Sequence, residues 1–154
     1  MAGAELLDRS RCWQISGVHD AEAFFRALPL LTPDATHLLL EGAPSRDVLS
    51  TIATHRDEEG EYEAPRGTMW SWPGRNRRLT LRTSLALYAA LGEAASRHAV
   101  PEVCYHLHLY QDDRPLVQWF DAFDDSLLVT ADIPRAHVEQ FCSETGGVIS
   151  ASAA

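Results

Sequence analysis

The stretch from residue 103 to residue 131 constrains the fold of this chain more than any other part of the sequence. Apolar and polar residues alternate over 103–110, 116–121 and 126–131, with acidic, turn-forming residues between the three runs. Alternation with a period of two is typical of strands that bury one face. Because short turns place consecutive strands side by side and antiparallel, the pattern predicts a three-stranded antiparallel meander near the C-terminus.

The turn at Asp112 and Asp113 sets a predicted register for the first two strands of this meander. A two-residue turn predicts the pairs Tyr110 with Pro115, His108 with Val117, His106 with Trp119, and Cys104 with Asp121. One face is then apolar enough to be the core side, and it comprises Val103, Tyr105, Leu107, Leu109, Leu116, Phe120, Leu127 and Val129. The opposite face is mixed, typical of a pocket wall or an interface, and it comprises Cys104, His106, His108, Tyr110, Val117, Trp119, Asp121, Leu128 and Thr130.

The rest of the chain alternates expected strands with amphipathic helices. Strands are expected at 11–18, 36–41 and 77–82. Helices are expected after Asp20, after Pro44, after Thr83 or Ser84, and from Pro134 to Gly146, with Pro29 and Pro33 bounding the first helix. We therefore expect an α+β fold: a mixed sheet that includes the meander, with about four helices packed on one face.

Length and composition predict one globular domain. The chain has 154 residues, of which 45% are hydrophobic and 23% charged, which matches ordinary folded proteins. We expect a flexible N-terminus at 1–10, a single domain at 11–149 and a frayed tail at 150–154. A monomer or a homodimer is expected.

The sequence also favours a cytoplasmic bacterial protein. It has no apolar run near the roughly 20 residues that cross a bilayer, and its start lacks the pattern of a secretory signal. Three scattered cysteines, Cys12, Cys104 and Cys142, indicate reduced thiols rather than a disulfide framework. All thirteen basic residues are arginine, which is typical of a GC-rich genome.

Two groups of residues are candidates for a functional site. His106 and His108 lie two apart on one expected strand, so both rings point to one side and could bind a metal ion or act in catalysis, with Asp121 or Glu41 completing the site. The alternative is that these imidazoles are hydrogen-bonded within a half-buried face.

The second group combines tryptophans and arginines, the residues most often found as interface anchors: Trp70, Trp72, Arg75, Arg77 and Trp119. Its alternative is that the tryptophans fold their loop onto the body of the protein.

Three hypotheses for function follow from these features. A non-catalytic protein-binding module, such as an inhibitor-like, antitoxin-like or immunity-like partner, is favoured because no nucleophile motif or phosphate-binding loop is present. Its partner would be another protein, preferably a basic one, since the net charge of −9 disfavours nucleic acid. The alternatives are a small metal-dependent hydrolase-like enzyme that uses the pair His106 and His108, and a small-ligand-binding domain. The preferred hypothesis needs no cofactor.

Overall fold

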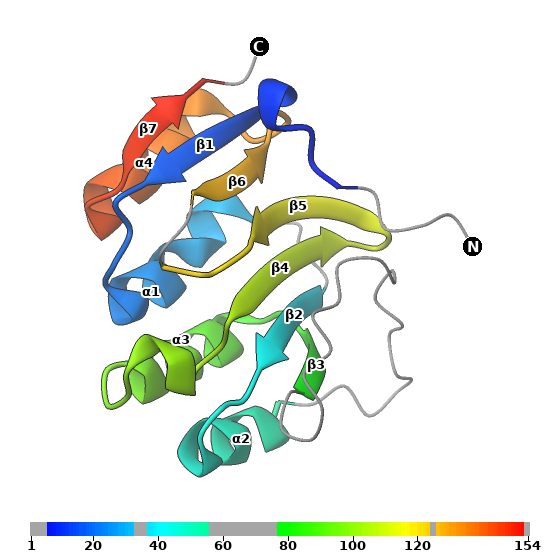
Figure 1. The fold of residues 1–154 in the computed structure, drawn as a ribbon, viewed down its shortest axis with the longest axis vertical. Coiled ribbons are helices and arrows are strands. Elements are labelled where there is room, and N and C mark those ends of the chain that lie inside the picture. The colour runs from blue at the N-terminus through cyan, green and yellow to red at the C-terminus, as the bar shows by residue number, and fades with distance from the viewer. Residues whose placement is uncertain (1–5, 33–36, 56–76, 124–125, 153–154) are drawn as a thin grey trace.

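The computed structural model describes residues 6–32, 37–55, 77–123 and 126–152, and for Arg77 and Pro101 it describes the backbone alone. These residues form an antiparallel sheet of seven strands in the order β3-β2-β4-β5-β6-β1-β7 (Figure 1). The strands are β1 Cys12–Ser16, β2 His37–Gly42, β3 Arg77–Arg82, β4 His106–Gln111, β5 Arg114–Trp119, β6 Leu127–Thr130 and β7 Val148–Ala151. The predicted meander is confirmed as β4, β5 and β6, which are neighbours in the sheet.

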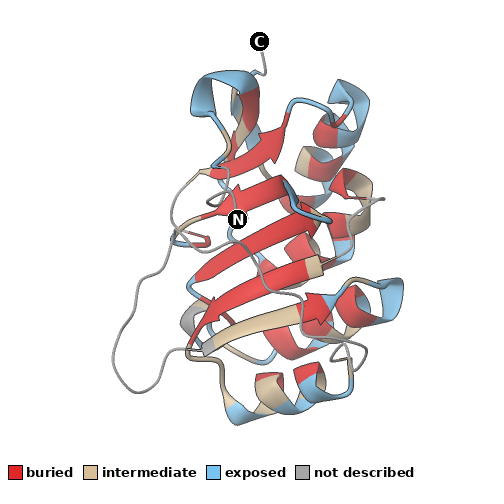
Figure 2. Ribbon diagram, turned by 90° about the vertical axis from the view of Figure 1, so that its right-hand side faces the viewer, coloured by how far each residue is buried: buried red, intermediate tan, exposed pale blue. Residues whose placement is uncertain are grey.

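The α-helices cover one face of this sheet, and within the described residues the other face has no helix (Figure 2). They are α1 Ala21–Leu31, α2 Arg46–Ala53, α3 Leu85–Ala95 and α4 Arg135–Thr145, with short 3-10 turns η1 Arg9–Arg11 and η2 Val100–Glu102. Three helices begin where the side chain of Asp20, Ser45 or Ser84 accepts a hydrogen bond from the first helical turn. No helix in the described part of the chain is both long and apolar enough to cross a membrane.

The hydrophobic core lies between the helices and the sheet. Alternate strand residues such as Leu38, Leu107 and Leu109 face it, and α1 supplies Phe24 and Leu28. The next residue along each strand points to the opposite side, which we call the helix-free face. This face is not simply solvent-exposed, because Leu39 and Tyr110 form a small buried cluster on it.

The prediction of a mixed sheet is wrong, because every strand pair in the sheet is antiparallel. Strands β1 and β2, joined through α1, do run in the same direction. They are separated by the whole meander, which lies between them in the strand order. Each therefore pairs only with neighbours that run the opposite way.

Two predicted boundaries also need correction. The expected tail at 150–154 begins inside β7, whose residues pair with β1 from Gln14 to Ser16. Pro29 does not end the first helix but lies inside α1. Proline in a helix removes one donor and usually breaks it. Here α1 continues to Leu31, and its last turn closes on Leu28 O, which accepts from both the backbone N–H and the hydroxyl of Thr32.

The predicted register between β4 and β5 holds only next to the turn. Tyr110 pairs with Pro115 as expected, but a bulge follows, so His108 pairs with Gln118 and Leu107 with Trp119. A one-residue shift turns every later side chain to the other face. Trp119 and Val117 therefore lie in the core, and Phe120 contacts His106 and His108 instead.

Candidate functional site

Four polar side chains meet on the helix-free face, where β3, β2 and β4 lie side by side. Glu41 on β2 is paired across the sheet with Arg78 on one side and with His106 on the other. His108 lies two residues further along β4, so its ring points to the same face. We call Glu41, Arg78, His106 and His108 the polar patch.

The patch is buried although none of the described helices covers it. Relative exposure is 5% for Glu41, 8% for His106 and 1% for His108. Charged and polar side chains are seldom this buried unless they are paired. The hydrogen bonds of each member therefore decide what the patch can do.

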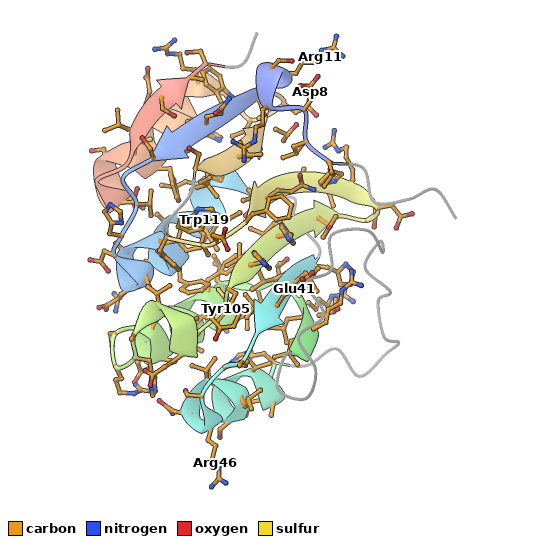
Figure 3. The ribbon with its side chains drawn as sticks, in the orientation of Figure 1. Asp8, Arg11, Glu41, Arg46, Tyr105 and Trp119 are labelled. Carbon is orange, nitrogen blue, oxygen red and sulfur yellow. The ribbon has the colours of Figure 1, made fainter. Side chains whose placement is uncertain are left out.

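Glu41 is incompletely satisfied. Its Oε1 atom lies 3.9 Å from Arg78 Nε, which is an ion-pair distance but too long for a hydrogen bond, and it has no hydrogen-bond partner. Burial raises the pKa of this carboxyl, and the positive charges of Arg78 and His106 partly oppose that rise. The backbone of Glu41 is better held, because its carbonyl accepts from Tyr105 N at 2.8 Å. Figure 3 shows Glu41 and Tyr105 close together.

His106 is oriented by the backbone. Its Nδ1 atom accepts a hydrogen bond from the backbone N–H of Asp121 at 3.0 Å. The neutral ring therefore carries its proton on Nε2. Asp121 contributes to this contact through its backbone, while the residue itself is solvent-exposed with a positive φ of 47°.

Among the described residues, neither ring nitrogen of His108 has a hydrogen-bond partner, although the side chain is almost fully buried. Its ring packs against Phe120, with a centroid distance of 4.9 Å. Burial lowers the pKa of His108 to about 3, and the charges of His106 and Arg78 act in the same direction. The imidazole is therefore neutral, with one donor and one acceptor, and leaving such a group unsatisfied costs about 1 to 3 kcal/mol.

The described residues do not assemble the metal site that was considered from the sequence. No group of three or more His, Cys, Asp or Glu side chains in that part of the chain could hold a metal ion. Two of the candidate ligands make other contacts instead. His106 Nδ1 is occupied by the backbone of Asp121, and Glu41 faces the guanidinium of Arg78.

Of the predicted partner-binding group, the structure describes the side chain of Trp119 alone. Trp119 is 1% exposed and packs between Phe24 and Phe123, with ring centroids 4.7 and 4.4 Å away. It therefore offers almost no area to a partner. Trp70, Trp72 and Arg75 lie outside the described residues, as does the side chain of Arg77, whose backbone begins β3.

The members that sequence reasoning missed depend on pairings between distant segments. Arg78 joins the patch because β3 pairs with β2, and Phe120 packs against its imidazoles because of the bulge in β5. One signal for the bulge was available in Pro115. Proline cannot donate to a sheet, so inside a central strand it is typically found beside a bulge.

Comparison with known proteins provides no further guide to this site. Neither a protein-family model, nor a curated protein, nor a solved structure matches the chain. What the polar patch does must therefore follow from the chemistry of its own residues.

Proposed function

We propose that this protein is a non-catalytic binding module, and that the polar patch binds a small, uncharged molecule with hydroxyl or amide groups. The observation that supports this most is His108, whose buried ring has a donor and an acceptor without partners. A bound molecule that satisfied both would recover the free energy that burial costs. Buried polar groups of this kind otherwise call for an ordered water.

The protonation states of the buried groups favour binding over catalysis. A general base works best when its pKa lies near the operating pH, whereas the pKa of His108 is about 3. Burial also raises the pKa of the Cys104 thiol to about 12, so that little thiolate, the nucleophilic form, is present at neutral pH. His106 already uses Nδ1 to accept from the backbone.

The charge balance of the patch supports an uncharged ligand. The carboxylate of Glu41 and the guanidinium of Arg78 face one another, and the imidazole of His108 is neutral. A charged ligand would lose its hydration without gaining a counter-charge of its own. Hydroxyl and amide groups each combine donors with acceptors, which matches the pair of functions on His108.

The test is ligand uptake by the wild type and by two matched histidine variants. Native mass spectrometry of the purified protein reports any molecule that remains bound, and thermal shifts with a panel of polyols, sugars and amides extend the search. We expect His108→Leu to abolish the shift that a ligand produces in the wild type. His137→Leu, at an exposed position on α4, should keep it. If no molecule is bound and none of the panel raises the melting temperature, the patch holds water and the proposal fails.

A protein partner is the second candidate, and β3 supports it. This strand is last in the strand order at its edge of the described sheet, and the segment from Trp70 to Arg77 leads into it. The main chain of an edge strand can pair with a strand of another protein. The net charge of −9 favours a basic partner, with an association rate that falls as salt rises.

Trp70→Ala and Trp72→Ala variants test this second candidate. If these side chains anchor a partner, each truncation should cost about 2 kcal/mol or more of binding while leaving the melting temperature nearly unchanged. A pull-down from the native host followed by titration of each variant measures both effects. Variants that bind every recovered partner normally, yet melt well below the wild type, would place the two tryptophans in the folded body instead.

A further inference from the structure

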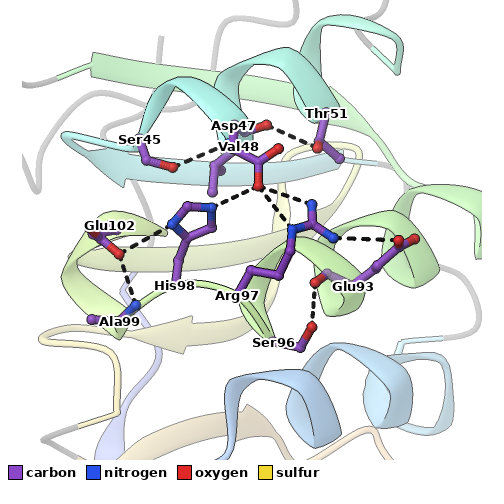
Figure 4. Close-up of polar contacts among 10 residues, drawn as sticks. All are labelled: Ser45, Asp47, Val48, Thr51, Glu93, Ser96, Arg97, His98, Ala99 and Glu102. Carbon is purple, nitrogen blue, oxygen red and sulfur yellow. Dashed lines mark hydrogen bonds and ion pairs between the residues drawn. The ribbon is translucent and has the colours of Figure 1, made fainter.

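A second group of charged side chains lies on the outside of the molecule, where α2 meets the end of α3. Its centre is His98, which follows α3 and lies between two carboxylates (Figure 4). His98 Nε2 is 2.7 Å from Asp47 Oδ2 at the start of α2, and His98 Nδ1 is 3.2 Å from Glu102 Oε2 in η2. The ring thus bridges two separate elements.

This geometry determines the charge on His98. An ionised carboxylate can only accept hydrogen bonds, so both ring nitrogens must donate, and both donate only in the imidazolium form. The pKa of His98 is accordingly raised, chiefly by the hydrogen bond to Asp47 and to a lesser extent by Glu102, while desolvation opposes the rise. Because the ring separates the two carboxylates, they do not converge on a common point where a cation could bind.

The carboxylates around His98 outnumber the cations. Arg97 donates from Nε and Nη2 to Asp47 Oδ2, at 3.2 and 3.0 Å, and its Nη1 reaches Glu93 Oε1 at 3.4 Å. Arg46, also in the first turn of α2, points away from the molecule (Figure 3). With His98 protonated, two cations face the three carboxylates of Asp47, Glu93 and Glu102, and without that proton Arg97 faces them alone.

The two elements that His98 bridges lead directly to the polar patch. The loop before α2 is bonded to η2 through Ser45 N and Glu102 O, at 2.8 Å. Three residues beyond Glu102, Tyr105 N donates to Glu41 O, also at 2.8 Å. One connection, residues 42–45, therefore begins after Glu41, and the other, residues 103–105, ends before His106. His98 contacts the outer end of each, at Asp47 and Glu102.

We propose that protonated His98 is a latch that joins the start of α2 to η2, and that its deprotonation as pH rises loosens the two connections to Glu41 and His106. The latch is closed below the pKa of His98 in the folded protein and opens as pH passes above it. Its existence does not depend on the proposed function, since it is built from contacts within the chain. If the patch binds a ligand, opening the latch changes access to Glu41 and His106.

The first measurement is the titration of His98 in the intact protein by NMR. We expect its midpoint to lie above the ordinary value of 6.5 in the wild type, and to fall in Asp47→Asn, which removes the nearer carboxylate charge. Glu102→Gln should lower it less. Glu93→Gln is the matched control, because Glu93 contacts Arg97 rather than His98, and it should leave the midpoint nearly unchanged.

The second measurement is amide hydrogen exchange at residues 42–47 and 98–105 across this titration. After correction for the intrinsic pH dependence of exchange, these amides should exchange faster once His98 is deprotonated. The exchange rate well above the midpoint should exceed the rate well below it by at most tenfold for each unit of difference between the pKa of His98 in the closed form and its pKa in the open form. His98→Gln should abolish this pH dependence without unfolding the protein, because its side chain lies at the surface between two elements.

Three results would overturn the latch: a wild-type midpoint at or below 6.5, exchange rates that do not follow the titration, or a pH dependence that survives in His98→Gln. Failure of the proposed function looks different, since it is a lack of ligand uptake in a protein whose His98 titrates as expected. The two experiments therefore separate the two proposals.

Discussion

At the scale of single residues, Gly42 shows how tightly the end of β2 is packed. Its φ of 151° is rarely adopted by residues with a side chain. A Cβ atom there would lie 2.8 Å from Tyr105 N, which is the atom that donates to Glu41 O. Glycine is required because two stretches of backbone approach each other closely at this point.

We therefore predict that Gly42→Ala destabilises the protein by about 1 to 3 kcal/mol. Gly146→Ala is the matched control, since Gly146 also has a positive φ, of 77°, but nothing lies within 4 Å of a Cβ built there. That variant should cost nearer 1 kcal/mol. Urea denaturation of both variants measures the difference, and equal costs would show that the close approach to Tyr105 contributes nothing.

At the scale of elements, β5 connects the sheet to α1 through one large side chain. The bulge turns Trp119 toward the helices, where its ring packs against Phe24 of α1 and against Phe123. Phe24 also contacts Phe141 of α4, with ring centroids 6.0 Å apart. The aromatic cluster therefore joins β5, α1 and α4 in the centre of the core.

Trp119→Ala should accordingly cost about 3 to 5 kcal/mol of unfolding free energy, as large-to-small core substitutions do. Trp119→Phe, which keeps an aromatic ring in contact with Phe24, should cost less. Thermal and chemical denaturation followed by circular dichroism measures both variants. A Trp119→Ala protein as stable as the wild type would mean that this side chain does not lie in the core.

At the scale of the whole molecule, the buried imidazole of His108 makes stability depend on pH. Its pKa is about 3 in the folded protein but near 6.5 in the unfolded chain, so the unfolded state binds the proton first as pH falls. Above pH 6.5 this difference in pKa takes nothing from the free energy of unfolding. As pH falls from 6.5 toward 3, the free energy of unfolding decreases. The raised pKa of Glu41 acts in the opposite sense, because the folded state then takes up a proton more readily.

We predict that the wild type loses up to about 5 kcal/mol more stability than His108→Leu between pH 6.5 and pH 3, at about 1.4 kcal/mol for each unit of pKa. At neutral pH, and without a ligand, the variant should be at least as stable as the wild type, because leucine leaves no unsatisfied nitrogen. Urea denaturation at several pH values checks both statements. Parallel pH profiles for the two proteins would show that His108 is hydrogen-bonded or hydrated when folded.

Local sequence signals determined much of the secondary structure. Asp20 and Ser84 begin helices as expected because their short polar side chains accept from nearby backbone N–H groups. The turn at Asp112 and Asp113 joins two strands of the predicted meander, with Tyr110 opposite Pro115. Each of these features depends on neighbours within a few residues, which is why the sequence alone was enough.

The candidate site depended on contacts that no local pattern contains. The sequence showed that His106 and His108 share one side of a strand. Which residues lie next to them was decided by the tertiary structure. Pairing of β2 with both β3 and β4 brought in Glu41 and Arg78. Because of a one-residue bulge, Phe120 lies on the helix-free face, where the sequence predicted Trp119. Periodicity specifies which residues share a face, whereas the partner strand and its register are set by long-range packing, which only the folded chain provides.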